Sequence, residues 1–411
     1  MIHSHFLYVK DRFDSILQVR FKRKAVNKKK ALPSIALVVS LMTMSATFAS
    51  SDEIHDLGLK AARGDAAANL EMAKRYENGT GIEKNLGEAY FYYSRAVHFG
   101  NSKEASKRFD VFRSRYDEIE VKAKSGDVKA EYDFATILEA DIDYQNFNPR
   151  RNEPKFTDWY LLAAKQGYRP AQKALGAVYA RGERGKPDTE RALYWYSTWA
   201  QSGSASDQLE FAQLLDKYPF MLLKNKKELK VKWLTASAKN GSPEGMLHLG
   251  YFIRDEDKKD KEAFNWFLKS AEKGNNAGQF AVGSILFHEG KKEEAVKWFV
   301  KSAENGSMWA QEQLGEIYEE MEPANPERAL FWYQKAAKQG YTYAAYSVCH
   351  YLHEGITVAK DATAAWAWCS IGADATPDSI EERDIIAKEL SPSESKNAQK
   401  LYEKLKSTLK K

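Results

Sequence analysis

The segments Ala310-Gln-Glu-Gln-Leu-Gly-Glu-Ile-Tyr318 and Ala329-Leu-Phe-Trp-Tyr-Gln-Lys-Ala-Ala-Lys-Gln-Gly340 carry two apolar patterns with the spacing of helices. In the second segment, one alanine lies three residues before Trp332, another lies five residues after it, and Gly340 lies eight residues after it. These spacings place the alanines and the tryptophan on one broad helical face. Because glycine suits the left-handed residue that ends a helix, we expect this helix to end at Gly340.

The first segment predicts a helix with a small residue in its middle. Leu314 is followed by Gly315, and Tyr318 comes three residues later. A glycine inside a helix costs about 1 kcal/mol relative to alanine. We infer that Gly315 allows a close approach to the helix packed against it. The column of small residues comprises Ala73, Gly176, Ala212, Gly250, Gly283, Gly315 and Cys349.

Both patterns repeat along most of the chain. Seven of the ten tryptophans share the register of Trp332, and Tyr92 takes that place in the first copy. The intervals between successive glycines from Gly167 to Gly340 are 36, 38, 33, 32 and 34 residues. Helix pairs of this length stack on one another and share a core. The register comprises Trp159, Trp195, Trp233, Trp266, Trp298, Trp332 and Trp368, and the glycines are Gly100, Gly167, Gly203, Gly241, Gly274, Gly306 and Gly340.

The copies at 310–340 and 171–203 resemble the Sel-1-like repeat, a relative of the tetratricopeptide repeat. The earlier copy reads Ala171-Gln-Lys-Ala-Leu-Gly-Ala-Val-Tyr-Ala-Arg-Gly182, followed by Arg191-Ala-Leu-Tyr-Trp-Tyr196 and Gly203. The resemblance covers roughly residues 52–376, with degenerate copies near 101–167 and an insertion from Asp141 to Phe156. It implies an all-α protein in which about nine repeats form a right-handed α/α superhelical solenoid over residues 50–376.

Residues 377–411 depart from the repeat. The stretch Glu381–Leu390 reads as one helix, and Pro392 suits the first position of another. A solenoid needs its last apolar face to be covered. We therefore expect residues 377–411 to form capping helices.

The first 49 residues have the order of an export signal. Nine Lys and Arg against two Asp precede or flank an apolar run from Ala31 to Phe48, and Thr47 and Ala49 are the small residues of a cleavage site. We expect cleavage after Ala49 and a periplasmic or secreted protein with no membrane span. An uncleaved anchor is the alternative, and translation could begin as late as Val26.

Composition excludes several function classes. The chain is 43% hydrophobic and 13% aromatic, which is incompatible with disorder over most of its length. The net charge of +5 comes from the basic leader, so the remainder offers no electrostatic surface for nucleic acid. Phosphate-loop and nucleophile-elbow motifs are absent from the sequence. We expect no cofactor.

The two cysteines, Cys349 and Cys369, would lie at the same height on an antiparallel hairpin, because they are symmetric about residue 359. A disulfide requires Cα atoms about 4.4–6.8 Å apart, and export would permit oxidation. A disulfide and two buried thiols both remain open. Cys349, His350 and His353 could also hold a metal, although solvent-facing histidines are the simpler interpretation.

A binding surface follows by elimination, from the stripe of each first helix that is not used for packing. In superhelices of this kind, the first helices line the concave face. Aromatic residues with a charged rim are typical of a peptide-binding groove. The alternative is that Phe280 and Phe287 pack inside the array. The predicted partner-binding residues are Leu247, Tyr251, Arg254, Phe280, Phe287, Glu312, Glu316, Glu319, Tyr346 and His350.

These observations predict an adaptor that binds a protein or peptide in the cell envelope and is not an enzyme. The alternative is a secreted hydrolase of cell-wall or β-lactam compounds, which the resemblance allows because some cysteine-rich members carry such activities. Those members have cysteine pairs in most repeats, whereas this chain has one pair. The sequence does not predict the partner or the oligomeric state.

Overall fold

The computed structural model describes residues 51–100, 103–141, 155–182, 186–217, 219–321, 323–373 and 377–409. The expected export signal at 1–49, with its cleavage site, lies outside these residues. The described residues form α-helices and one 3-10 turn, with no β-strand among them. No helix in this part of the chain is long and apolar enough to span a bilayer.

The chain divides into two compact units, Met1–Glu118 with Thr136–Pro149, and Ile119–Ala135 with Arg150–Lys411. The helices α7 and α8 contribute residues to both units. The first unit otherwise contains α3 to α6. These helices are α3 (Ser51–Ala62), α4 (Ala66–Asn78), α5 (Leu86–Gly100), α6 (Lys103–Ser114), α7 (Tyr116–Lys124) and α8 (Val128–Ala140).

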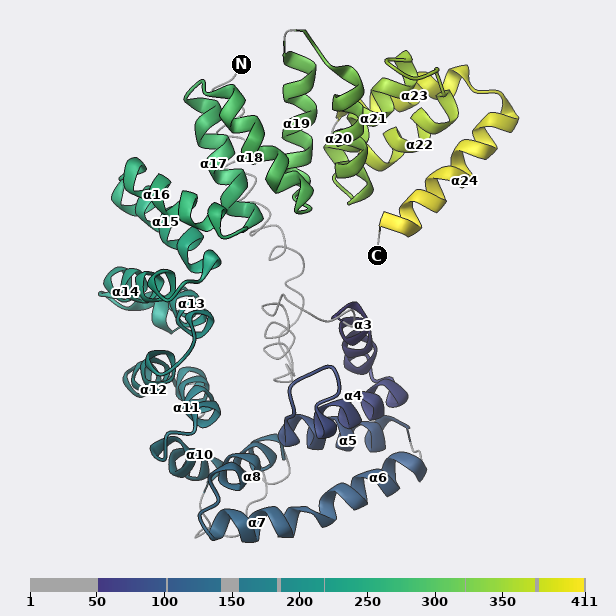
Figure 1. Cartoon of the computed structure of the whole chain (residues 1–411). Helices are drawn as coiled ribbons and strands as arrows, with labels where there is room; N and C mark the ends of the chain where they lie inside the picture. The colour runs from purple at the N-terminus through teal and green to yellow at the C-terminus, as the bar shows by residue number, and fades with distance from the viewer. Residues whose placement is uncertain are drawn as a thin grey trace. The chain divides into compact units, whose positions relative to one another are not determined.

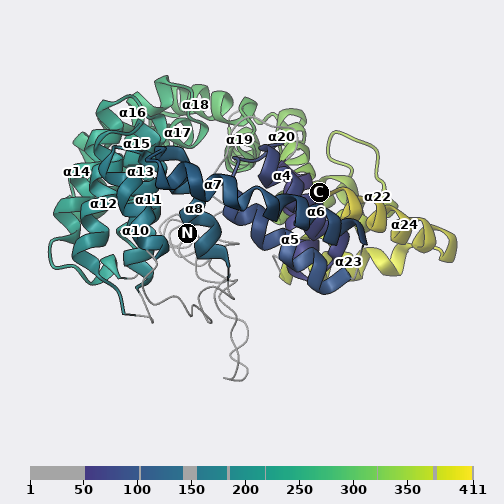
Figure 2. The ribbon, with the colours of Figure 1, turned by 90° about the horizontal axis from the view of Figure 1, so that it is seen from below.

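The second unit is a stack of antiparallel helix pairs (Figure 1). From α11 to α18, the first helices of the pairs lie in an inner row and the second helices in an outer row (Figures 1 and 2). The unit is therefore an α/α solenoid. Its helices are α10 (Phe156–Lys165), α11 (Arg169–Arg181), α12 (Thr189–Gln201), α13 (Ala205–Leu214), η1 (Phe220–Leu222), α14 (Lys226–Lys239), α15 (Pro243–Asp257), α16 (Asp260–Glu272), α17 (Asn276–His288), α18 (Lys292–Glu304), α19 (Met308–Glu320), α20 (Pro326–Lys338), α21 (Thr342–Glu354), α22 (Ala362–Gly372), α23 (Pro377–Glu389) and α24 (Pro392–Leu409).

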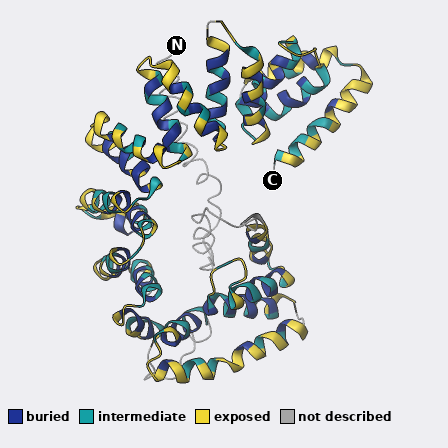
Figure 3. Ribbon diagram, viewed as in Figure 1, coloured by how far each residue is buried: buried dark blue, intermediate teal, exposed yellow. Residues whose placement is uncertain are grey.

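The glycines in the column of small residues lie directly against the second helix of their pair, which confirms that these positions are close contacts. A Cβ atom added to Gly250 would lie 2.6 Å from Cε1 of Phe267, and one added to Gly283 would lie 2.8 Å from Cδ1 of Phe299. The partner of each glycine is thus the aromatic residue that follows the tryptophan of the register. In each pair, the buried residues lie on the side of one helix that faces the other helix (Figure 3).

The glycine at the end of the second helix has the predicted left-handed conformation in five copies and not in the other two. The backbone φ angle is positive at Gly167, Gly241, Gly274, Gly306 and Gly340. Gly100 is instead the last residue of α5, and Gly203 does not have a positive φ. The prediction was wrong at these two positions because eight-residue spacing alone does not fix the backbone conformation.

Buried polar side chains connect successive pairs. The amide of Gln279 on α17 donates to the carbonyl of Ala271 in the preceding pair at 3.3 Å, and its oxygen accepts from Asn305, at the end of α18 in its own pair, at 3.0 Å. Gln311 repeats the arrangement, donating to Ala303 at 2.9 Å and accepting from Gln339 at 2.7 Å. Carbonyls near a helix C-terminus lack partners within their helix. The Ala271 and Ala303 carbonyls also accept from the backbone N–H groups of Gly274 and Gly306, so each glutamine adds a second donor and links its pair to the preceding one.

The chain ends in two helices that follow the last pair. Helices α23 and α24 both pack on α22, and α23 also contacts α21. Ile386 of α23 and Ala398 of α24 are fully buried. This packing brings the acidic first half of α23 beside α21, where it forms part of the candidate site.

Candidate functional site

The predicted partner-binding residues lie on the first helices of four pairs, α15, α17, α19 and α21. Tyr251 and Arg254 belong to α15. The ring of Tyr251 meets Phe267 of α16 edge-on, with centroids 4.9 Å apart, and the Arg254 guanidinium lies 4.9 Å from the centroid of Tyr251. Burial raises the pKa of Tyr251. Arg254 thus covers a half-buried ring and keeps its charge at the surface.

Phe280 and Phe287 lie on α17, and both rings pack against Phe299 of α18. Their ring centroids are 5.6 Å and 6.5 Å from that of Phe299, and both side chains are partly buried against the core. Each ring therefore packs on the array and retains an exposed part. Leu247 differs, because only 8% of it is exposed. Its inclusion among the surface residues was wrong, since it packs with the core around α15.

The acidic residues of α19 are engaged with neighbouring side chains. The hydroxyl of Tyr333 donates to Glu319 at 2.8 Å, and Gln313 donates to Glu316 at 2.7 Å. Burial, followed by the carboxylates of Glu319, Glu316 and Glu312, raises the pKa of Tyr333. Glu319 itself is exposed, whereas Glu312 and Glu316 are half-buried. The three carboxylates form one negative surface on α19.

A hollow of about 350 Å³ lies between α21 and α23. It contains two of the predicted residues, Tyr346 and His350, together with residues from the capping helix. Burial and the neighbouring Glu382 raise the pKa of Tyr346. No Lys or Arg is among the described residues that line the hollow. Its lining comprises Tyr346, His350, His353, Glu354, Asp378, Glu381, Glu382 and Ile385.

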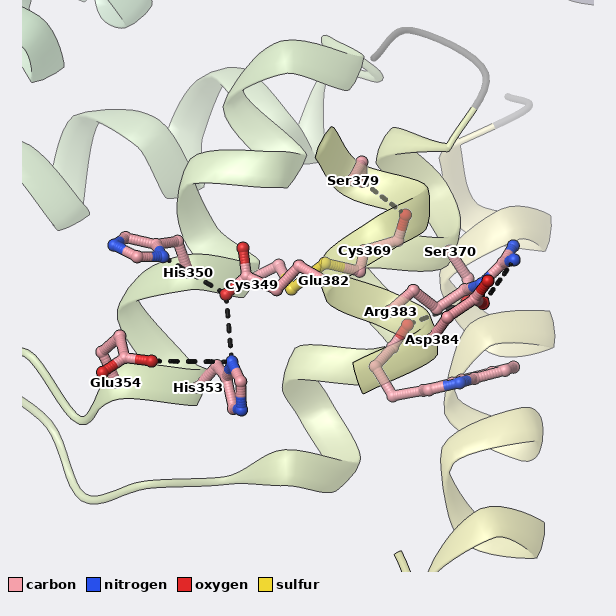
Figure 4. Close-up of a disulfide and its surroundings, with 11 residues drawn as sticks. Cys349, His350, His353, Glu354, Cys369, Ser370, Ser379, Glu382, Arg383 and Asp384 are labelled. Carbon is pink, nitrogen blue, oxygen red and sulfur yellow. Dashed lines mark hydrogen bonds and ion pairs between the residues drawn. A yellow bond between two sulfur atoms is a disulfide. The ribbon is translucent and has the colours of Figure 1, made fainter. Parts of the chain in front are cut away.

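Two histidines of α21 share one carboxylate oxygen in this hollow (Figure 4). The Nδ1 atom of His350 lies 3.2 Å from Oε1 of Glu382, and the Nδ1 atom of His353 lies 3.1 Å from the same oxygen. The Nε2 atom of His353 lies 3.4 Å from Oε1 of Glu389. Burial lowers the pKa of His353, but its hydrogen bonds to Glu382 and Glu389 outweigh that effect and raise it.

Cys349 and Cys369 are joined by a disulfide in the structure, with Cα atoms 5.2 Å apart. Both residues are fully buried, and the hydroxyl of Ser379 donates to the carbonyl of Cys369 at 2.8 Å. Cys349 occupies the column of small residues, and Cys369 follows the tryptophan of the register. The disulfide therefore takes the place of the glycine–aromatic contact of other pairs. It also removes the Cys349 sulfur from the metal-ligand set that the sequence suggested.

The acidic residues of α23 that line the hollow, Asp378, Glu381 and Glu382, were absent from the predicted set. They lie beyond the repeat, and the histidine bonds to Glu382 join residues 29 and 32 positions apart. The only sequence signal was the acidic start of the capping segment. Acidic residues are favoured near the N-terminus of any helix, so this signal does not point to a site.

The pairing geometry and its period identify the repeat. The Sel1 repeat profile matches residues 66–98, 158–168, 169–204, 243–275, 277–307, 310–341 and 342–376, about half of the chain. The chain belongs to the Sel1 repeat family. Sel1 repeats generally form non-catalytic scaffolds that mediate protein interactions.

Two solved structures are similar to this Sel1 repeat protein. A Sel1 repeat protein from Oxalobacter formigenes is 19% identical, with a TM-score of 0.51 over 87% of this chain and 96% of that chain. A protective antigen of uropathogenic Escherichia coli with an SLR fold is 22% identical, with a TM-score of 0.49 over 91% of both chains. The first of these likenesses shows a shared fold.

Two curated proteins are also similar to parts of this chain. Chitin synthase regulatory factor 3 of Schizosaccharomyces pombe is 26% identical over 244 residues, covering 53% of this chain and 25% of that protein. An F-box protein of Arabidopsis thaliana is 32% identical over 97 residues, covering 24% of this chain and 28% of that protein. The chain thus spans about a quarter of the length of each relative.

Proposed function

We propose that the protein is a non-enzymatic adaptor that binds a protein or peptide along the inner row of its second unit. The observation that carries this proposal is the set of half-buried rings on α15 and α17, namely Tyr251, Phe280 and Phe287. Each ring is anchored by a neighbour in the array and keeps an exposed part. In many protein interfaces, a few rigid aromatic side chains beside charged residues supply most of the binding affinity.

The charge of α19 indicates which kind of partner would suit this surface. Glu312, Glu316 and Glu319 extend the aromatic region with negative charge. A partner segment with apolar side chains followed by Lys or Arg would complement both parts. The rim carboxylates would mainly accelerate association, and the aromatic residues would supply affinity.

We also propose that the adaptor acts in the cell envelope, because the first 49 residues have the order of an export signal. N-terminal sequencing of the protein from its native cells tests this. A mature chain that begins at Ser50 is expected. A full-length chain in the cytoplasmic fraction would contradict the proposal.

Site-specific photocrosslinking in the native cells tests the binding surface. A benzophenone side chain replaces Ser284, which lies between Phe280 and Phe287 on α17. A matched probe replaces Lys297, an exposed residue of the outer helix α18. We expect a discrete crosslinked partner from position 284 and not from position 297. Crosslinking from position 297 alone would place the partner on the outer helices instead.

A further inference from the structure

His353 of α21 lies between two carboxylates of the capping helix α23. Its Nδ1 atom is 3.1 Å from Oε1 of Glu382, and its Nε2 atom is 3.4 Å from Oε1 of Glu389. An ionised carboxylate can only accept hydrogen bonds, and a neutral imidazole carries one N–H group. Only the protonated imidazolium donates from both nitrogens. The ring therefore bonds to both carboxylates at once only when it is charged.

The bond between His353 and Glu382 is the better shielded of the two. Both side chains are 12% exposed, whereas Glu389 is 53% exposed. A partly buried ion pair is screened by salt much less than an exposed one. His350, which is 47% exposed, places its Nδ1 atom 3.2 Å from the same oxygen of Glu382 and adds a second possible donor. Glu382 is thus the main connection between α21 and α23.

The other charged groups around His353 are also acidic. Glu354 of its own helix places Oε1 3.7 Å from the Nδ1 atom, and Asp378 and Glu381 of α23 line the same hollow. No Lys or Arg is among the described residues that line it. A neutral His353 would leave these carboxylates close together without a cation between them. Their repulsion would then act between α21 and α23.

The other two helices that pack on α21, α20 and α22, supply no described cation to His353. Helix α22 has no titratable side chain except Cys369, which is in the disulfide. On α20, Lys335 lies over rings of its own helix, and Arg328 lies over a ring of α19. The other titratable residues of α20 are the exposed Glu327 and Lys338, and Tyr333, which bonds to Glu319.

We propose that His353, Glu382 and Glu389 form a protonation-dependent clasp that holds the capping helix α23 against the last repeat. The charged imidazole closes the clasp, and loss of its proton releases α23 from α21. Helix α23 would still be held on α22 by Ile386, which is fully buried. The clasp does not depend on the proposed partner, because all of its groups belong to this chain.

The direction of the pH dependence follows from the folded and unfolded states of His353. Burial lowers the pKa of His353, but its hydrogen bonds to Glu382 and Glu389 outweigh that effect and raise the pKa above its ordinary value of 6.5. A group with a raised pKa in the folded state contributes its full stability below the unfolded pKa. The clasp is therefore closed in acid, and it weakens as pH rises through the folded pKa of His353.

Hydrogen–deuterium exchange of the full, non-reduced protein tests the clasp at about pH 5.5 and about pH 8.5. Labelling times are scaled for the intrinsic exchange rate at each pH, and peptides from α23 are compared. We expect the protection of the α23 amides to fall by roughly tenfold at the higher pH, the size of one hydrogen bond to a charged group. Because this readout is local, pH-dependent changes in other helices do not enter it.

Two substitutions at position 353 separate charge from packing. His353→Gln is neutral at every pH, so its α23 should show at both pH values the protection that the parent has at the higher one. His353→Lys is charged at both, so its α23 should stay protected at the higher pH. His55→Gln changes an exposed histidine of α3 and should keep the parental pH dependence. Circular dichroism confirms that each variant is folded.

Three results would overturn the proposal. The first is equal protection of α23 in the parent at both pH values. The second is a parental pH dependence in folded His353→Gln, which would assign the effect to other groups. The third is a loss of protection in His353→Lys at the higher pH that equals the loss in the parent, which would show that a charge at position 353 does not hold the helix.

Discussion

Gly315 of α19 faces the ring of Tyr333 of α20 so closely that a Cβ atom at Gly315 would lie 2.6 Å from Cδ1 and 2.7 Å from Cζ of that ring. The Tyr333 hydroxyl donates to Glu319 one turn further along α19. Tyr333 therefore packs against Gly315 and also forms a hydrogen bond to Glu319 in the negative surface of the candidate site. The close approach of the two helices positions Glu319.

Substitution of Gly315 by leucine should destabilise the second unit. The added side chain cannot fit without separating α19 from α20, and overpacking typically lowers the free energy of unfolding by about 1–3 kcal/mol. Urea unfolding followed by circular dichroism measures the change. Gly58→Leu is the control, because a Cβ at Gly58 of α3 meets no described neighbour within 4 Å. Equal unfolding curves for Gly315→Leu and the parent would show that α19 and α20 are not tightly packed at Gly315.

Replacement of both cysteines by alanine should lower the stability of the last repeat. A bridge between residues 20 positions apart restricts the unfolded chain, and loss of such a bridge typically costs about 2–4 kcal/mol. Peptide mapping of the parent without reductant should recover a peptide pair linked through Cys349 and Cys369. Free thiols in the protein isolated from its native cells, with unchanged unfolding of the double variant, would contradict the expectation.

The first unit should lose stability as pH rises toward neutrality, because of Glu88. Its Oε2 atom is buried without a hydrogen-bond partner in the described part of the chain, and burial, with a contribution from Glu139, raises the pKa of Glu88 to about 7. The pKa in the folded state exceeds that of the unfolded chain. Stability is therefore greatest below the unfolded pKa of about 4.5 and falls as pH rises through about 7.

Glu88→Gln isolates this effect, because the amide stays neutral throughout. Thermal unfolding at pH 5.5 and pH 8 should show a smaller decrease for Glu88→Gln than for the parent. Glu83→Gln, a change at an exposed residue in the preceding loop, is the matched control and should behave as the parent does. An identical decrease in all three proteins would assign the pH dependence to other groups.

The double variant Tyr251→Ala/Phe287→Ala should lose partner capture while keeping its helical circular dichroism. Truncation of aromatic anchors at a binding surface typically costs about 2 kcal/mol or more of binding free energy. Affinity for the partner identified by crosslinking measures the loss. Phe331→Ala removes a ring of α20, the second helix of its pair, that is 49% exposed, and it should leave affinity unchanged. Unchanged affinity in the double variant would exclude the aromatic surface.

The triple variant Glu312→Gln/Glu316→Gln/Glu319→Gln should bind the same partner with a slower association rate and a weaker salt dependence. Glutamine still accepts the hydrogen bond of Tyr333, so the fold should be kept. Rim charges mainly affect association. Surface plasmon resonance at two salt concentrations measures both rates. The control changes three exposed glutamates of α18, Glu293, Glu294 and Glu304, and should keep the parental rate.

The sequence by itself determined the repeated helix pair, because its contacts recur at fixed intervals. The small column and the tryptophan register both predict which faces meet, and the glycine at the helix end was correct at Gly340. The sequence was less informative about which aromatic residue meets the column. Tryptophan was the conspicuous residue, but Tyr333 and its counterparts one position later make the contact. Neighbouring residues of a helix point in different directions, so the direction of the helix face decides which of the two meets the glycine.

Only the tertiary structure decided the composition of the hollow. His350 and His353 belong to the repeat, whereas Glu382 belongs to a capping helix with no periodic relationship to it. The spacing of a repeat constrains neighbours within the array, but the docking of a terminal segment depends on its packing against the last apolar face. The burial of Leu247 was also decided by the tertiary structure. Its exposure depends on the helices packed around it and not on its position in the repeat.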